Sequence, residues 1–442
     1  MNKSVQETAL PQASAARMGQ TRFIPVDRSD IYERLVSTVP WTEDELPIAE
    51  GVLHYLSRLR QQDSCISLDR MAAYYDPFNP DDETVNGGER ETMDLEPLLN
   101  AFGNQLQMLV EAGNFERISE AKLDRILSET SPGGVEVEVD LTEFDLMLLY
   151  ARGESTSTKD VRDWTTFFLK KQINIEVYKR LLMVVKFKPD VVRLEELRQK
   201  HLGDEKKARK ALKKLRSSLP KDASTDKIYL KMFKDIPILD METLFPNTHV
   251  KLRYWDKVQL FLSGGGTTVA GIAGAAGKIV AATVLTPFVL LMAIFGLGGV
   301  LFRQVMNLIN TRTKYMMQLA QNLYFHSLAN NQSVLAYLID EAEEENIKEE
   351  MLLYTSLLKG ARAPGQLDRA ALDIEAFLLH HWGVKVDMDI RDAEQRLRDT
   401  GLLSTGPDGL LDVMPLPQAR GHLMRLWSQS LERGRPVSLA NI

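Results

Sequence analysis

Apolar residues recur at helical spacing in the N-terminal part of the chain. From Ser29 to Leu59 they return every three or four positions, which predicts helices that bury one face. The same spacing returns from Leu95 to Leu109, after a break rich in Pro, Asp and Gly at Tyr75–Gly88. Residues 1–21 are polar, rich in Ala, Ser and Gln, and have no apolar signal core, so they predict a disordered tail.

The pattern then changes from helical spacing to alternation. Val135, Val137 and Val139 alternate with acidic residues, as in a half-buried strand. Asp145–Arg152 and Ile173–Lys188 are similar, and the three segments together predict an antiparallel β meander packed on the preceding helices. We expect these helices and strands to form one α+β domain, residues 22–250.

One segment, residues 258–302, is almost entirely apolar. Its roughly 45 residues contain a single charge, Lys278, and one bilayer crossing needs about 20 apolar residues. The segment therefore predicts a two-helix transmembrane hairpin, although its Gly-rich first half also suits a re-entrant or interfacial helix. Basic residues on both flanks favour both ends on the cytoplasmic side, with Lys278 at the far tip. The flanking residues are Lys251, Arg253, Lys257 and Arg303.

Small residues in this segment suggest how its two helices pack. Rows with a spacing of four allow close approach of helix backbones, and a proline is expected to kink the second helix. The packing partner is either the other helix of the hairpin or a second subunit in a homo-oligomer. The residues concerned are Gly266, Ala270, Gly271, Gly274, Gly296, Gly299 and Pro287.

A strongly basic helix is expected near residues 205–221. Eight Lys or Arg fall within about 16 residues from Lys206. Three interpretations are open, namely a solvated helix face, contact with anionic lipid head groups, and nucleic-acid binding. No aromatic residues interleave with the charges, so the stacking expected for single-stranded nucleic acid is missing, and we expect no nucleic-acid partner. The candidate lipid-contact residues are Lys206, Lys207, Arg209, Lys210, Lys213 and Lys214.

Composition and motifs give no catalytic or cofactor site. The chain has 54 basic and 61 acidic residues, a net charge of −7 and one cysteine, Cys65, which excludes a disulfide scaffold and a Cys-based zinc site. GIAGAAGKI resembles a P-loop, but Ile272 and Ile279 stand where Gly and Ser or Thr are required. We therefore expect no cofactor and no metal, and we do not favour an enzyme.

The C-terminal third is predicted to be helical, with one small hairpin. Residues 303–360 form a helical segment whose acidic helix, Val334–Leu358, lacks His and is expected to present a solvated acidic face rather than a metal site. Residues 364–434 resemble a winged-helix module, with helices at 367–382 and 389–400. The second helix holds four acidic residues against three basic ones, which favours protein docking or packing over DNA contact.

Several long segments resemble a known family. They are RFIPVDR (22–28), YYDPFNPDD (74–82), DLMLLYARG (145–153), YLKMFKDIPILDMETLFP (229–246) and LYFHSLANNQSVLAYLIDEAEEENIKEEMLLYTSLL (323–358). Together they resemble the transmembrane protein 143-like family, two-span membrane proteins of unknown function. The resemblance implies two membrane spans and offers no catalytic residue to carry over. The animal member of that family is mitochondrial.

The sequence as a whole predicts an α+β membrane protein, mainly helical, with a β meander, a transmembrane hairpin and a winged-helix-like module. We expect a membrane-anchored interaction or scaffold protein with protein partners and a lipid bilayer around its hairpin. The alternative is a small oligomeric channel or transporter built from the Gly-rich hairpin. A bacterial inner membrane is favoured, or a mitochondrial membrane if the chain is eukaryotic.

Overall fold

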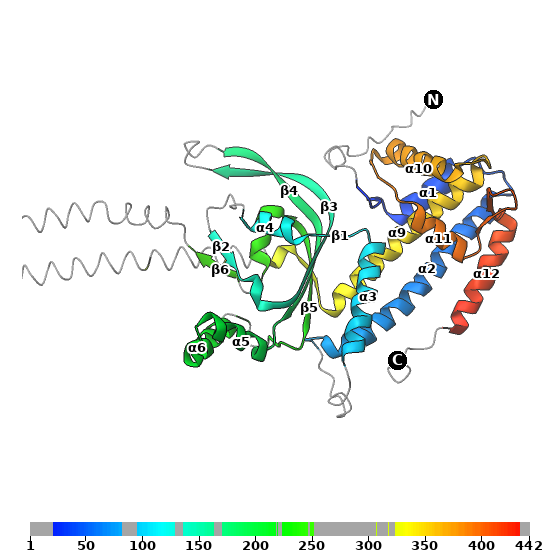
Figure 1. The fold of residues 1–442 in the computed structure, drawn as a ribbon. Helices are drawn as coiled ribbons and strands as arrows, with labels where there is room; N and C mark the ends of the chain where they lie inside the picture. The colour runs from blue at the N-terminus through cyan, green and yellow to red at the C-terminus, as the bar shows by residue number, and fades with distance from the viewer. Residues whose placement is uncertain are drawn as a thin grey trace, which may run out of the picture.

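The computed structural model describes residues 21–81, 95–128, 136–162, 170–217, 223–245, 248–251 and 323–433, and the single residues 219, 306 and 317. These residues form an α+β protein around an antiparallel sheet (Figure 1). The sheet lies between α4 and a set of long helices, and a second helical group lies beyond that set (Figure 1).

The main sheet has five strands in the order β1-β3-β4-β5-β7. All four strand pairs are antiparallel, and β3 and β4 form the longest pair. The strands are β1 (Glu116–Arg117), β3 (Phe144–Arg162), β4 (Lys170–Phe187), β5 (Ile228–Pro237) and β7 (Ser327–Asn330).

The central strands are buried on both faces, which explains their continuous apolar runs. In β4, Leu182 and Val184 belong to one core, while Leu181, Met183 and Val185 belong to the core on the opposite face. Successive side chains of a strand point to opposite faces, so a strand covered on both sides must be apolar at every position.

Different elements cover the two faces. One face packs against α2 (Leu46–Tyr75), α3 (Glu96–Ala112) and the first part of α9 (Gln332–Lys359). The other packs against α4 (Glu120–Ser128) and the 3-10 segment η6 (Ile238–Leu244). A two-helix hairpin, α5 (Asp190–Lys200) and α6 (Glu205–Arg216), follows β4.

A second helical group joins the two ends of the chain. Its core contains residues from α1 (Arg28–Thr38), the first part of α2 and the second part of α9, together with the C-terminal elements. Those elements have the order expected of a winged helix. They are α10 (Gln366–Trp382), α11 (Arg391–Asp399), β8 (Leu403–Thr405), β9 (Leu411–Val413) and α12 (Leu416–Arg433).

The strands differ from the prediction in three ways. The predicted strand at 135–139 forms as β2 (Glu136–Val139), but it pairs with β6 (Thr248–Lys251) in a separate two-stranded sheet. Strand β1 lies beside β3, where the meander would have placed the strand at 135–139, and β5, which was not predicted, pairs with β4. The helical segment expected at residues 303–360 is interrupted by β7 at Ser327–Asn330, because these residues pair with the edge of β5.

The predicted transmembrane hairpin, residues 258–302, lies outside the described residues. Among the helices that the structure does describe, none is both long enough and apolar enough to cross a membrane. The longest two, α2 and α9, have the length, but they carry charges such as Arg58, Arg60, Glu345 and Glu350 that a lipid-facing span excludes. We therefore correct the fold assignment to an α+β protein with an antiparallel sheet. The structure does not support the hairpin or a multi-pass bacterial inner-membrane or mitochondrial location.

Candidate functional site

The predicted basic segment, residues 205–221, contains helix α6. This helix is the second of the α5–α6 hairpin. Helix α6 begins after Asp204, whose side chain accepts a hydrogen bond from the backbone N–H of Lys207 at 3.1 Å. Ala208 is fully buried, and α6 packs against α5. The six predicted contact residues are all exposed; they are Lys206, Lys207, Arg209, Lys210, Lys213 and Lys214.

The hairpin is held to the sheet by two arginines. Arg193 of α5 donates to the carboxylate of the buried Glu143 at 2.6 Å. Arg216, at the end of α6, donates to Asp190 at 2.7 Å and to the carbonyl oxygen of Lys188 at 2.7 Å. These bonds fix one side of α6 against the protein and leave its lysines on the other side.

The outer charges of α6 are only partly neutralised. Lys207 and Arg209 form ion pairs with Asp204 and Glu205, but all four side chains are well exposed. Such exposed pairs contribute about 0–1 kcal/mol. Lys206, Lys210, Lys213 and Lys214 form no ion pair within the described part of the chain. Helix α6 is therefore a convex basic surface in a chain of net charge −7.

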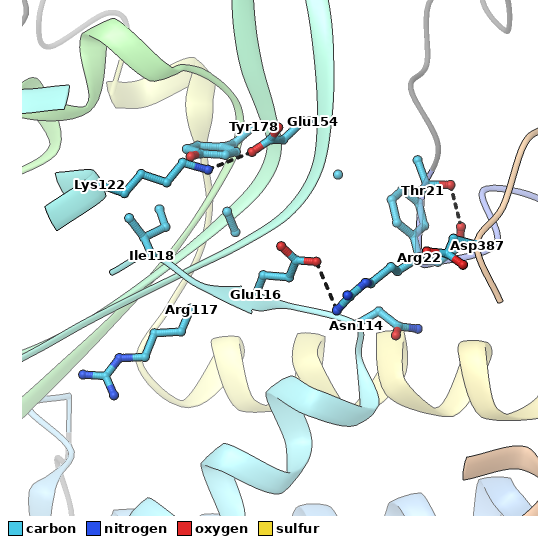
Figure 2. A pocket seen from close by; sticks show the side chains of 13 residues that line it. Thr21, Arg22, Asn114, Glu116, Arg117, Ile118, Lys122, Glu154, Tyr178 and Asp387 are labelled. Atoms are coloured by element: carbon cyan, nitrogen blue, oxygen red, sulfur yellow. Dashed lines mark hydrogen bonds and ion pairs between the residues drawn. The ribbon is translucent and has the colours of Figure 1, made fainter. Parts of the chain in front are cut away.

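A separate hollow of about 490 Å³ lies where the N-terminal residues meet the sheet and α4 (Figure 2). Lys122 of α4 reaches Glu154 of β3 at 3.0 Å, and Arg22 reaches Glu116 of β1 at 3.4 Å. Figure 2 shows Arg117 directed away from the Lys122–Glu154 pair. The basic groups that point into this hollow are therefore already paired with carboxylates.

Two ionisable groups of this hollow affect each other's pKa values. Burial raises the pKa of the Tyr178 phenol, and the nearby Lys122 ammonium acts in the opposite direction. Burial lowers the pKa of Lys122, but its contacts with Tyr178 and Glu154 outweigh burial and raise the pKa overall. Both groups thus keep their ordinary protonation states at neutral pH. Among the 13 described residues that line the hollow there is no His or Cys to serve as base or nucleophile.

One glycine is required at the edge of this hollow. Gly153 has a φ of +70°, and a Cβ there would lie 2.8 Å from Cε1 of Phe23. We expect Gly153→Ala to lower the free energy of unfolding by about 2 kcal/mol, since alanine is strained in the left-handed region and would displace the ring. Urea unfolding of both proteins measures the difference.

Gly103→Ala on α3 is the matched control for this substitution. No atom lies within 4 Å of the added Cβ, and the backbone is helical, so this change is expected to stabilise the protein by about 0.5–1 kcal/mol. Equal effects of the two substitutions would contradict the proposed strain at Gly153.

The acidic helix α9 holds the largest buried charge cluster among the described residues. The prediction that this helix presents a solvated acidic face was therefore wrong. Glu345 is fully buried, accepts from Arg152 of β3 at 3.0 Å and from Lys348 at 2.6 Å, and also accepts from the backbone N–H of Ile24 at 2.9 Å. Lys348 in turn donates to the carbonyl oxygen of Ile24 at 2.7 Å. Arg152 also pairs with Glu341. This half of α9 therefore fixes the N-terminal segment to the sheet.

The second half of the cluster connects α9 to α2 and to the winged-helix-like module. Glu350 is fully buried and accepts from Arg60 at 2.8 Å and from Arg396 of α11 at 2.7 Å. Arg396 also donates to Glu349 at 2.6 Å. Burial raises the pKa of Glu349 to about 7, although Arg396 acts against this shift. The expected solvated acidic face is thus largely inside the protein.

Helix α11 occupies the place of a recognition helix, but it is packed inward. Ala393 and Leu397 are buried, and Arg396 points into the carboxylates of α9. This agrees with the packing role predicted from its charge balance. Three arginines from elements far apart in the sequence complete the cluster, so local sequence patterns do not predict that they contact α9. They are Arg60, Arg152 and Arg396.

Most residues assigned to the predicted transmembrane hairpin and its flanks cannot be compared with the structure. Arg253, Lys257, Gly266, Ala270, Gly271, Gly274, Lys278, Pro287, Gly296, Gly299 and Arg303 lie outside the described residues. Lys251 is the last residue of β6. The channel alternative, which depends on these glycines, stays untested. No group of three or more His, Cys, Asp or Glu suited to a metal ion occurs within the described part of the chain.

Part of the chain is similar to a known protein family. A family model described as a protein of unknown function (DUF3754) matches residues 146–333, from β3 to the start of α9. No solved structure matches the chain. The resemblance to the transmembrane protein 143-like family stays a prediction. The matched segment contains most of β3, the strands β4, β5 and β7, and the α5–α6 hairpin, and the function of the family that the model describes is unknown.

Proposed function

We propose that this protein is an interaction protein that binds an anionic phospholipid surface through the outer side of α6. The observation that carries this proposal is the concentration of unpaired lysines there. Helix α6 has seven basic residues and one acidic residue, and its inward side is held by Ala208 and Arg216. A charge of this density is unfavourable on a free surface unless a counter-charge approaches it.

The shape of the surface favours an extended partner. The lysines project from a convex helix rather than into a cavity, and lysine ammonium groups act as hydrated point charges without the fixed fork geometry of arginine. An anionic lipid layer makes no geometric demand and gains about 1 kcal/mol for each lysine near its surface. Nucleic acid is less well matched, since no aromatic side chain of α6 is available for stacking.

Neutralising four lysines tests the proposal. We expect Lys206→Gln, Lys210→Gln, Lys213→Gln and Lys214→Gln in combination to weaken binding of the full chain to vesicles containing anionic phosphatidylglycerol by about a thousandfold, since each lysine contributes about 1 kcal/mol. Cosedimentation at increasing salt measures this. Binding of the wild-type chain should fall as salt screens the lysines, and the variant should be much less sensitive.

A charge-matched control variant shows whether vesicle binding depends on the lysines of α6 or only on the net charge of the protein. Four exposed arginines or lysines of the helical group, changed to glutamine, alter the net charge equally and should leave vesicle binding close to that of the wild type. The proposal fails if both variants bind alike, or if purely zwitterionic vesicles bind the wild type equally well. The control positions are Arg369, Lys385, Arg391 and Arg425.

A further inference from the structure

The turn between α5 and α6 holds a leucine that packs against nothing in the described structure. Leu202 is 99% exposed, the most exposed of the large apolar side chains described. It lies two residues before the capping Asp204, directly at the beginning of the basic helix. Single exposed leucines are common on proteins, so exposure alone carries no argument.

The backbone at Leu202 makes this residue unusual. Gly203 N–H donates to the carbonyl oxygen of Arg198 at 2.9 Å, and Leu202 N–H donates to that of Gln199 at 3.2 Å. This pair of bonds is the Schellman ending of a helix, and it places Leu202 at the left-handed position, with a φ of +54°. Glycine or asparagine normally occupies this position, because a larger side chain is strained there. Leucine at position 202 is therefore strained in its backbone and gains no packing from its exposed side chain, so it does not favour the fold.

Basic side chains surround this leucine along the chain. Arg198 and Lys200 precede it on the last turn of α5, and Lys206 and Lys207 follow it on the first turn of α6. All four are exposed. Arg198 and Lys207 also form exposed ion pairs, with Glu195 and Asp204. An apolar tip flanked by cations suits the boundary of an anionic lipid layer, where head groups pair with the cations and the tip reaches the acyl chains.

We propose that Leu202 is an insertion residue that enters the acyl boundary of an anionic phospholipid layer while the lysines of α6 bind its head groups. This inference rests on the proposed function, because the lysines bring the turn to the surface. It adds a contact with the lipid interior, which charge alone does not provide. It also explains why an apolar side chain stands at a position that suits glycine or asparagine.

Insertion can be observed directly with a dye at the tip. The chain has one cysteine, Cys65, which is exposed on α2. In a Cys65→Ser background, Leu202→Cys labelled with an environment-sensitive dye should shift to the blue on vesicles with phosphatidylglycerol. The same dye on Cys65 of the native chain is the matched control and should not shift. A label at position 202 that stays in a water-like environment on bound vesicles overturns the inference.

Substitution of the leucine gives an independent test. Leu202→Asn should weaken vesicle binding by about tenfold or more, since the buried apolar surface is lost. Its thermal midpoint should equal or exceed that of the wild type, because asparagine suits the left-handed position, so weaker binding cannot be ascribed to unfolding. Leu372→Asn on α10, an exposed leucine far along the chain, should leave binding unchanged.

The outcomes distinguish the two proposals. If the four-lysine variant loses binding and Leu202→Asn retains it, α6 binds lipid but Leu202 does not insert. If the four-lysine variant binds as the wild type does, the proposed function itself is wrong. A blue shift at position 202 without vesicles that grows with protein concentration would assign the tip to contact between two copies and overturn the inference.

Discussion

Replacing Arg152 with methionine is expected to lower the free energy of unfolding by about 3–5 kcal/mol. The Arg152 side chain is only 5% exposed and pairs with Glu341 and Glu345 of α9, and its Cζ lies 4.5 Å from the centroid of the Phe23 ring. Methionine fills much of the same space but leaves the fully buried Glu345 with Lys348 as its remaining side-chain cation. The cost is therefore that of a buried carboxylate that has lost one of its partners.

Two comparisons test this explanation. Arg117→Met on the adjacent strand β1 removes an exposed arginine and should change stability by less than about 0.5 kcal/mol. The triple variant Arg152→Met, Glu345→Met and Lys348→Met should recover part of the loss, because all three buried charges are then absent. Urea unfolding measures all four proteins. A loss below about 1 kcal/mol in Arg152→Met would show that this pair is not buried in solution.

The stability of the protein is expected to fall between about pH 4.5 and pH 7 through Glu349. Burial raises the pKa of this carboxyl to about 7 in the folded protein, above the ordinary glutamate value of 4.5. A folded-state pKa above the unfolded one means that the folded protein binds the proton more tightly. The stabilisation is therefore complete below about pH 4.5 and is lost as the pH rises through 7, by about 2–3 kcal/mol.

The Glu349→Gln variant isolates this contribution. Glutamine keeps the shape but carries no titrating proton, so the difference in unfolding free energy between variant and wild type should change by about 2–3 kcal/mol from pH 4.5 to pH 8. Asp340→Asn, on the exposed side of the same helix, should show a much smaller change. A pH-independent difference for Glu349→Gln would mean that Arg396 keeps this carboxyl ionised throughout.

Helices in this chain were predictable because their signals are local. The periodic apolar residues predict the boundaries of α10 within one residue and those of α3 within three. Gly401, with a φ of +73°, follows the C-terminal end of α11, where a glycine after the last helical residues is expected to stop the helix. Such signals depend on neighbours within four residues and need no knowledge of the fold.

Strand pairing was harder to predict from the sequence, since it depends on segments that are far apart along the chain. Strand β2 has the expected alternation, but nothing in residues 135–139 indicates that they pair with residues 248–251. Strand β5 does show a signal, because Ile228, Leu230 and Met232 share one buried face. The four residues of β7 are too few for any periodic pattern, and only the free edge of β5 makes them a strand.

The charged cluster shows a deeper limit of sequence interpretation. A helix as rich in glutamate as α9 is typical of a solvated surface, but the structure buries three of its glutamates, Glu345, Glu349 and Glu350. Their burial is explained only by arginines from α2, β3 and α11, which are between about 50 and 290 residues away in sequence. The basic face of α6 was easier to identify, because an exposed helix needs no distant partner to display its charges.

The position of α9 has a consequence for how the protein unfolds. Val334, Leu335 and Leu338 from its first turns belong to the core against the sheet, while Met351, Leu353 and Leu357 belong to the core of the helical group. One continuous helix is thus shared by both cores, and breaking it removes residues from each. The sheet and the helical group are therefore thermodynamically coupled, and they gain or lose their structure as a single cooperative unit.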